Sequence, residues 1–430
     1  MLIDSVCALM TLVWAYQFFL KKNYFGALTY IWAGVFVPLF LYQLGWSRLI
    51  NTSVSGMFNY IFIWLAVITL LYLALARNRK PRPIAADSRI LLTETGKMLS
   101  PVLNGGFLIL YLLENYLGSG SLVPALQEID IHTYSAPVIS YLTNTPFLVV
   151  AFDYYAYKAT RELRYWLWIL MIFATPIVTR SSRLQLMINA VQFVSLLLFV
   201  EASVAMKSRR ARKRYRQLKR SIVVLGAAAV IGLIQFTNYR MNHYGVYSFQ
   251  YADLIEYDGP KALTFLAPYY GYFPLSFNNL KINILKRSVP HNYIGLYSFT
   301  CFFFGLLQLD NLLGISTQGH IAHRLVTHGA ATVPTGFWDF YYDYGILCFI
   351  PIAVGMMVCY RFLKRAKKEK RRLTYRTLYF WFVPLWFFMS FQNILFGSTI
   401  MVAGILIKMV IRRSFVVKEQ DENLYRNDFV

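Results

Sequence analysis

Charged residues are scarce in this chain, and acidic residues are the scarcest. Asp and Glu number 20 against 43 Lys and Arg in 430 residues, and all charged residues make up only 15% of the sequence. A soluble globular protein carries about 25% charged residues. Together with a hydrophobic share of 57% and a positive mean hydropathy, this scarcity argues against a soluble protein.

Cysteine is also rare, and its pattern excludes two further classes. The four cysteines show no CxxC and no paired spacing, so the sequence predicts neither a disulfide framework nor a cysteine-based zinc site. Cys7, Cys348 and Cys359 lie in apolar runs, and Cys301 lies in an apolar part of a long polar segment. Their placement is typical of small apolar residues rather than of ligands.

Apolar runs of about 20 residues recur along the chain, and each is long enough to span about 30 Å of hydrocarbon as a helix. The runs are continuous rather than alternating, which excludes an outer-membrane barrel. The predicted fold class is therefore all-α, a polytopic membrane protein with about 11 transmembrane helices. The first run lacks a basic leader and a small-residue cleavage site, so we expect it to be a retained helix. The expected spans are 2–20, 24–45, 57–76, 98–117, 136–157, 165–179, 184–206, 221–236, 345–362, 376–392 and 395–411.

The basic residues alternate between the connections of these spans. The connections after the odd-numbered spans are basic, among them KSRRARKRYRQLKR and KRAKKEKRR, and those after the second, fourth, sixth and eighth are not. Placing the N-terminus outside assigns 34 of the 43 Lys and Arg to the cytoplasmic side and nine to the outer side. Such a bias sets orientation, so we predict an outer N-terminus and a cytoplasmic C-terminus. The basic runs are interpreted as anchors near anionic membrane lipid, and no nucleic acid is expected as a partner.

This topology predicts four parts. Residues 1–236 form an N-terminal bundle of about eight helices, and residues 237–344 form one large extracytoplasmic loop with amphipathic or re-entrant helices. Residues 345–411 hold the C-terminal transmembrane helices, and residues 412–430 form a cytoplasmic tail. The loop holds five of the six histidines, and its six basic residues balance its six acidic residues. Its charged side chains are therefore considered one at a time.

An arginine-containing turn, TRSSRLQLM, joins the sixth and seventh spans on the outer side. The sixth span has about 15 residues, so it rises only about 22 Å against about 30 Å of hydrocarbon, and the eighth is similarly short. This geometry draws Arg180, Arg183 and Arg240 toward the outer membrane surface. A guanidinium keeps its charge, and its donor fork suits phosphate oxygens. The three arginines are candidates for holding a lipid-linked diphosphate, and snorkelling to headgroups is the alternative.

The motif PHNYIGLYSF begins at Pro290 inside the predicted loop. A neutral imidazole of His291 could take a proton from an attacking sugar hydroxyl, and Asn292 could fix a carbonyl or hydroxyl beside it. The alternative is an ordinary surface histidine without a chemical role.

The motif GFWDFYYDYG leads from the loop into the ninth span. Asp339 and Asp343 are four residues apart, so they share a face if the segment is helical. Rings such as Trp338 and Tyr342 could stack on a sugar while a carboxylate binds its hydroxyls, and Asp343 could also orient an arginine or a histidine. The alternative is an interfacial aromatic belt.

A third loop motif, GHIAHRLVTHGAA, places three histidines around Arg324. His320, His323 and Arg324 would share a helical face. Zinc would require a third or fourth ligand with outer support, and His328 is the only nearby candidate. We therefore prefer a solvated helical face, with Arg324 directed at a substrate, over a metal site.

The overall plan and these motifs resemble the Wzy-type oligosaccharide repeat-unit polymerases, which are related to the O-antigen ligases. The resemblance rests on many helices with one large outer loop before the last few, and on three short matches. The matches are the turn 179–183, the His291-Asn292 pair with Gly305 downstream, and the aromatic-Asp-aromatic-Gly sequence at 342–345. Members of the family commonly have more spans, and the two large outer loops of some members have no alignable counterpart here.

The resemblance implies transfer of a growing glycan from undecaprenyl diphosphate to a lipid-linked repeat unit, at the outer face of the bacterial cytoplasmic membrane. Such enzymes make O-antigen, capsule or exopolysaccharide. His291 or Asp343 would activate the acceptor hydroxyl, and the arginines, Arg324 included, would neutralise the departing diphosphate. No metal and no cofactor are expected, and a flippase and a chain-length regulator are the expected protein partners. The alternatives are a flippase or transporter of the same lipid-linked unit and a ligase-type glycan transferase.

Overall fold

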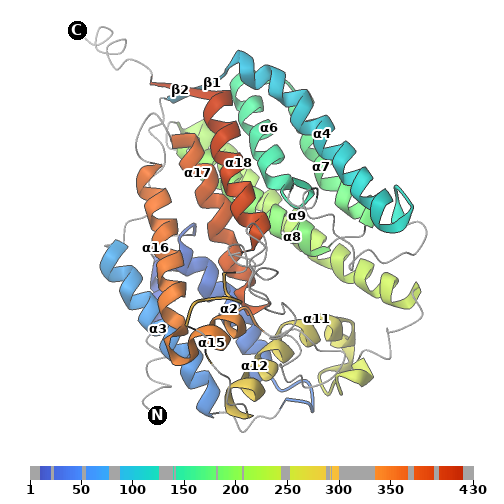
Figure 1. The fold of residues 1–430 in the computed structure, drawn as a ribbon, viewed down its shortest axis with the longest axis vertical. Coiled ribbons are helices and arrows are strands. Elements are labelled where there is room, and N and C mark those ends of the chain that lie inside the picture. Colours follow the sequence, from blue (N-terminus) through green and yellow to red (C-terminus); the bar gives the residue numbers. More distant parts are fainter. Residues whose placement is uncertain are drawn as a thin grey trace. The chain divides into compact units, whose positions relative to one another are not determined.

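A computed structural model of the chain is helical almost throughout (Figure 1). In the part of the chain that it describes there are 13 α-helices and one two-stranded sheet, so the predicted all-α class is confirmed. The described residues are 10–20, 24–50, 55–76, 88–124, 139, 142–180, 183–205, 208–243, 252–286, 291, 293–299, 335–366, 372–391 and 397–419.

Packing divides the chain into two compact units, each assembled from three segments. Unit 1 comprises Met1–Pro81, Leu225–Tyr360 and Phe382–Ile400, and unit 2 comprises Arg82–Val224, Arg361–Trp381 and Met401–Val430. The four predicted parts follow membrane topology rather than packing, and their boundaries stay a prediction.

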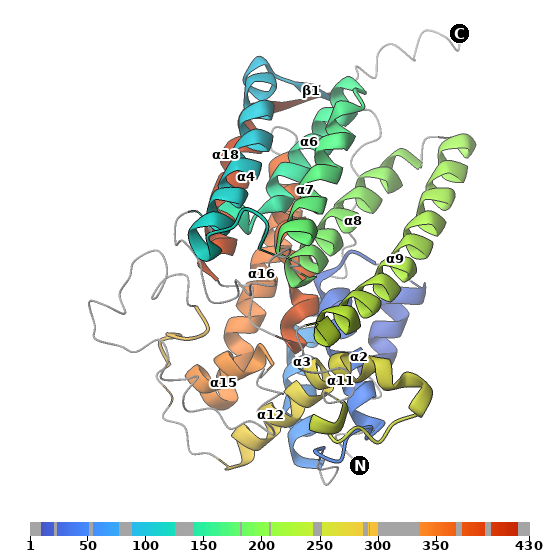
Figure 2. The ribbon, with the colours of Figure 1, turned by 90° about the vertical axis from the view of Figure 1, so that its right-hand side faces the viewer.

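Unit 2 is built around α6, which is buried over eleven consecutive residues from Pro146 to Ala156. This helix packs against α4, α7 and α8, and Figure 2 shows these helices side by side. The hydroxyl of Thr93 caps α4 by accepting from the Gly96 N–H at 3.0 Å, and Gly120 ends it in the left-handed conformation. The helices are α4 (Glu94–Ser119), α6 (Pro146–Thr160), α7 (Arg164–Arg180), α8 (Arg183–Ala205) and α17 (Arg372–Phe382).

A short antiparallel sheet in unit 2 was not predicted. Strand β1 (Ser88–Leu92) pairs with β2 (Phe415–Glu419), so residues expected in a plain cytoplasmic tail form a strand. The ring of Phe415 packs on Phe152 and Tyr155 of α6, with centroids 5.1 Å and 5.8 Å apart. The sequence FVVKE directly follows an apolar helix. Five residues are too few for a strand-like alternation to be distinguished from the periodicity of that helix.

Unit 1 holds its helices in direct backbone contact. A Cβ on Gly34 of α2 would lie 2.0 Å from the carbonyl oxygen of Phe387 in η7, so only glycine permits this approach. The elements of unit 1 are η1 (Tyr16–Leu20), α2 (Ala27–Gln43), α3 (Ser55–Ala76), η3 (Lys261–Leu266), α11 (Ala267–Tyr272), α12 (Pro274–Lys286), α15 (Phe337–Tyr344), η5 (Gly345–Cys348), η7 (Val383–Ser390) and, as far as Tyr360, α16 (Phe349–Arg365). Two further helices among the described residues are α9 (Arg209–His243) and α18 (Ser398–Ser414).

Three helical stretches among the described residues are long and apolar enough to cross a membrane: Glu94–Ser119, Gln185–Ala202 and Phe337–Arg365. Shorter apolar helices occur as well, at Met10–Leu20, Ala27–Gln43, Ile63–Ala74 and Arg164–Thr179. The predicted count of 11 spans is therefore not confirmed. Two helices illustrate why: α9 begins inside a basic run, and α17 has only 11 residues before the chain turns to 3-10 helix.

We expect Gly34→Ala to lower the stability of the protein, because its new methyl group would overlap the backbone of Phe387. Overpacking of this kind costs about 1–3 kcal/mol. Gly105→Ala in α4 is the matched control, since nothing lies within 4 Å of a Cβ at that position. Thermal unfolding of the two detergent-purified variants measures the difference. Equal melting temperatures would contradict the contact.

Candidate functional site

The candidate site lies in unit 1. There, one aspartate of α15 binds a short segment whose described residues are 291 and 293–299, referred to below as the 291–299 segment. The fully buried carboxylate of Asp343 accepts hydrogen bonds from the backbone N–H groups of Tyr297 (3.1 Å) and Ser298 (2.6 Å) and from the Ser298 hydroxyl. The N–H of Tyr293 donates to the Asp343 carbonyl oxygen at 3.0 Å. Hydrogen bonds to an ionised acceptor are the strong ones, so this residue holds the segment in place.

Tyr297, near the end of the segment, lies close to the same carboxylate. Burial, and next to it the nearby Tyr342 and Asp343, raise the pKa of the Tyr297 phenol above its usual value. The rings of Tyr297 and Tyr342 meet edge to face at 5.0 Å. The phenol therefore stays protonated over the physiological range.

The ring of His291 is held on the same helix. Its Nδ1 lies 3.1 Å from the carbonyl oxygen of Tyr342. A carbonyl oxygen only accepts, so we assign a proton to Nδ1, and in the neutral form of the ring the lone pair then lies on Nε2. The ring makes edge contacts with Tyr293 and Tyr341 at 5.8 Å and 5.7 Å, and it is half-buried. The neutral ring would therefore offer Nε2, on the side of Gly345, as a proton acceptor, and the side chain is partly exposed.

Two glycines are required by this arrangement. Gly345 has φ +54°, and a Cβ there would lie 2.6 Å from Nε2 of His291. Gly295 has φ +87°, and a Cβ there would lie 2.4 Å from the Tyr344 hydroxyl oxygen. Both positions favour glycine by backbone conformation and by space. The glycine in the predicted aromatic-Asp-aromatic-Gly motif thus gives room to the histidine of the other motif.

The aromatic residues of α15 divide into buried and accessible ones. Trp338 is fully buried and stacks on Tyr341 at 6.1 Å, and Tyr342 is also buried. Tyr341 and Asp339 are half-buried. The sugar contacts of Trp338 and Tyr342 stay a prediction. In this conformation both side chains are part of the core, and rings nearer the surface, such as that of Tyr341, belong to other residues.

The predicted arginines lie at helix ends. Arg180 is the last residue of α7 and Arg183 the first of α8, both in unit 2, and Arg240 lies in the last turn of α9. Their role as diphosphate ligands stays a prediction. The predicted roles of Asn292 and Arg324 fall outside the described residues. The three histidines of the third loop motif also lie outside them.

Helix α12 was missed by sequence reasoning although its polar residues are buried. The Tyr42 hydroxyl donates to the Asn278 side chain at 3.1 Å, and the amide of Asn278 donates to the Leu49 carbonyl at the same distance. Lys281 is only 5% exposed, and burial lowers the pKa of its ammonium group. The signal was the sequence SFNNLKIN, in which polar residues occupy every face of a short helix.

A buried carboxyl group in unit 2 was missed as well. Asp153 of α6 accepts from the Asn104 amide of α4 at 3.1 Å, and both side chains are fully buried. Its second oxygen has no hydrogen-bond partner among the described residues. An acidic residue inside the apolar run FLVVAFDYYAY was the available signal, because ionisable residues in such runs are rare and commonly functional.

No group of three or more His, Cys, Asp and Glu that could hold a metal ion occurs within the described ranges. No protein family, curated protein or solved structure matches this chain.

We expect Asp343→Asn to release the 291–299 segment from α15, because an amide cannot accept as strongly as a carboxylate and brings an N–H group toward the donors. A hydrogen bond to a charged group contributes about 1.5–3 kcal/mol, equivalent to about ten- to hundredfold faster amide exchange. Hydrogen exchange of the peptide containing Tyr297 and Ser298 measures this release. Asp339→Asn, on the same helix and half-buried, is the control, and unchanged exchange in Asp343→Asn would show that the carboxylate does not hold the segment.

Proposed function

We propose that this protein is a membrane glycosyltransferase that polymerises lipid-linked oligosaccharide repeat units at the outer face of a bacterial cytoplasmic membrane. The observation that carries the proposal is the His291 ring, half-buried and with Nδ1 bonded to the Tyr342 carbonyl. The ring lies against Gly345, and Gly345 belongs to the stretch Phe337–Arg365 that is long enough to cross a membrane. A base at such a position suits an acceptor delivered on a lipid.

In the proposed reaction, the acceptor hydroxyl of one repeat unit attacks the anomeric carbon of the donor glycan. The new glycosidic C–O bond forms while the bond from that carbon to the undecaprenyl diphosphate breaks, and the hydroxyl proton passes to Nε2 of His291. The imidazolium then returns the proton to water. General base catalysis of this kind contributes about 10²–10⁴-fold. The reaction needs no nucleotide sugar or ATP because the diphosphate is already the leaving group, and the proposed arginines would neutralise its charge in place of a metal.

Asp343 is assigned a positioning role in this proposal. Its carboxylate already accepts three hydrogen bonds from the 291–299 segment, so His291 is the better acceptor for the proton. Asn292, Asp339 and the exposed faces of nearby tyrosines are proposed to contact the sugar.

The leaving diphosphate carries the charge that grows most in the transition state, and its stabilisation is expected to be the largest single contribution. Arg180, Arg183 and Arg240 are proposed to bind it, with Arg324 closing on the donor. The proposal retains 11 spans with the N-terminus outside. Its substrate partner is the undecaprenyl-diphosphate-linked oligosaccharide, and a flippase and a chain-length regulator are its proposed protein partners.

Transport of the same lipid-linked unit is a second candidate function, and the buried Asp153–Asn104 pair favours it. A buried carboxyl group within apolar helices is a common feature of proton or substrate pathways in transporters. The two functions differ in where single repeat units accumulate when the protein fails. A transporter leaves them inside, whereas a polymerase leaves them at the outer face.

We expect His291→Gln to reduce polymer formation by about 10²–10⁴-fold, because glutamine has no basic nitrogen. The glycan ladder of cells carrying the variant measures the effect, together with the side of the membrane on which single units lie. His132→Gln, outside the predicted loop, is the control at equal protein level. A normal ladder in His291→Gln would overturn the assignment, and units trapped inside would favour transport.

We expect Arg180→Ala and Arg183→Ala each to lower the turnover rate by about 10²–10³-fold, the loss typical of removing one group that stabilises developing charge. Lysine at either position should recover only part of the rate, because it keeps the positive charge but lacks the two parallel donors of the guanidinium group. Arg48→Ala is the control, since Arg48 lies on the predicted outer side in an exposed ion pair with Asp258. Full activity of both turn variants would exclude the diphosphate role.

A further inference from the structure

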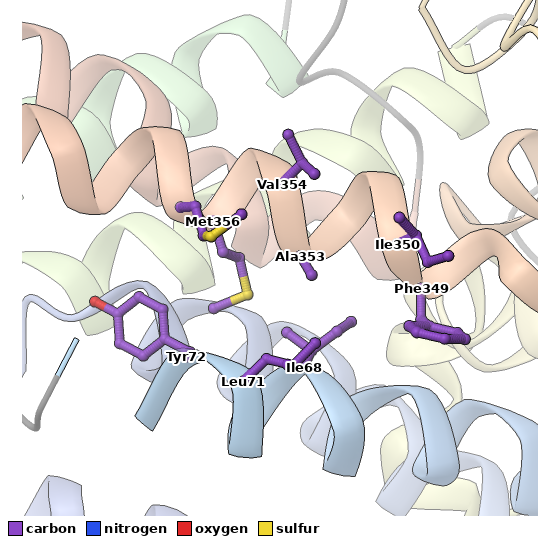
Figure 3. Close-up of a pocket in the computed structure, with 9 residues that line it drawn as sticks. Ile68, Leu71, Tyr72, Phe349, Ile350, Ala353, Val354 and Met356 are labelled. Carbon is purple, nitrogen blue, oxygen red and sulfur yellow. The ribbon is translucent and has the colours of Figure 1, made fainter. Parts of the chain in front are cut away.

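An apolar cavity lies between α3 and α16 in unit 1 (Figure 3). Its volume is about 170 Å³. In Figure 3, Phe349 and Ala353 of α16 face Ile68 and Leu71 of α3, and Tyr72 lies at one end. Apart from the Tyr72 hydroxyl, the described lining side chains are hydrocarbon or thioether. A cavity of this composition stays dry and takes apolar ligands.

The cavity is accessible from the side of the helices that would face lipid. Leu71 is 40% exposed, and Ile350 and Val354 are each 48% exposed. These residues belong to apolar helices, and α16 lies within one of the three stretches able to cross a membrane. A ligand would enter from the hydrocarbon layer, where a polar molecule is not available. The ligand class is therefore a hydrocarbon chain.

Both helices that line the cavity lie next to the candidate site, since α16 follows η5 directly and α3 contacts α15 through Trp64 and Tyr341. On α16 the lining begins at Phe349, four residues after Gly345, which corresponds to a rise of about 8 Å along the 3-10 helix η5. On α3 the lining begins at Ile68, four residues after Trp64, whose ring lies 6.0 Å from that of Tyr341. The cavity therefore begins about one helical turn from the residues around His291.

We propose that this cavity binds the isoprene units nearest the diphosphate in the polyprenyl chain of a lipid-linked substrate. The inference rests on the proposed function and adds a binding site for the lipid part. A dry apolar cavity of about 150 Å³ holds a molecule the size of benzene, so the volume here suits a branched five-carbon unit. Ala353 leaves room for a methyl branch, and the flexible side chains of Met356 and Met357 adapt to it.

Photolabelling tests the site independently of activity. The probe is undecaprenyl diphosphate with a photoreactive group on its first isoprene units, applied to the full-length protein in nanodiscs. We expect labelled peptides from both 63–74 and 349–357, and at least a tenfold loss of label with excess undecaprenyl diphosphate but not with excess phosphatidylglycerol. Equal displacement by phosphatidylglycerol would identify an ordinary lipid groove and overturn the proposal, as would labelling elsewhere only.

Two variants that fill the cavity provide the second measurement. Leu71→Trp and Ala353→Trp should each reduce labelling at least tenfold and raise the KM for the lipid-linked repeat unit. Leu70→Trp is the matched control, since Leu70 neighbours Leu71, is 55% exposed and does not line the cavity. Wild-type labelling and KM in both filled variants would overturn the proposal. A wild-type protein that binds the probe at this site but transfers no glycan would instead refute the proposed function alone.

Discussion

The buried carboxylate of Asp343 is the interaction on which the candidate site depends. It joins two parts of the chain that are about 45 residues apart, and it does so by accepting from three donors, the N–H groups of Tyr297 and Ser298 and the Ser298 hydroxyl. A buried carboxylate without such donors would be costly. Because the same short segment begins with His291, the position of the proposed base follows from the position of a residue that does not itself react. In the proposed function, the buried aspartate therefore acts by positioning another residue.

The stretch Phe337–Arg365 joins residues of the candidate site to a helical stretch that is long and apolar enough to cross a membrane. Its first helix carries Asp343, its 3-10 turn carries Gly345, and its last helix lines the apolar cavity. A helical connection is short and stiff, so a lipid chain lying on α16 and a sugar beside His291 would be held at a nearly constant separation. Such preorganisation is the physical basis of proximity effects in catalysis. It is also the reason for proposing that one molecule with an apolar tail and a polar head binds this part of unit 1.

Much of the helical framework could be predicted because a continuous apolar run of about 20 residues is a strong local signal. Each predicted span overlaps a helix, and the turn between Arg180 and Arg183 lies where two helices end and begin. The pairing of β1 with β2 could not be predicted, since the strands are five residues long and over 300 residues apart. The number of spans also lay beyond local patterns, because length, kinks and 3-10 segments decide which apolar helices can cross a membrane.

Composition and motif positions by themselves determined the all-α class, the expectation of a membrane protein and the prediction that His291, Tyr342 and Asp343 are site residues. Only the tertiary structure decided that these three lie together, that Trp338 is a core residue and that Asp343 is occupied by the 291–299 segment. The physical reason is that local sequence dictates which face of a helix is apolar. Local sequence does not determine which distant N–H group donates to a buried carboxylate. That depends on the path of the chain between the two residues, which is decided by packing of the whole fold.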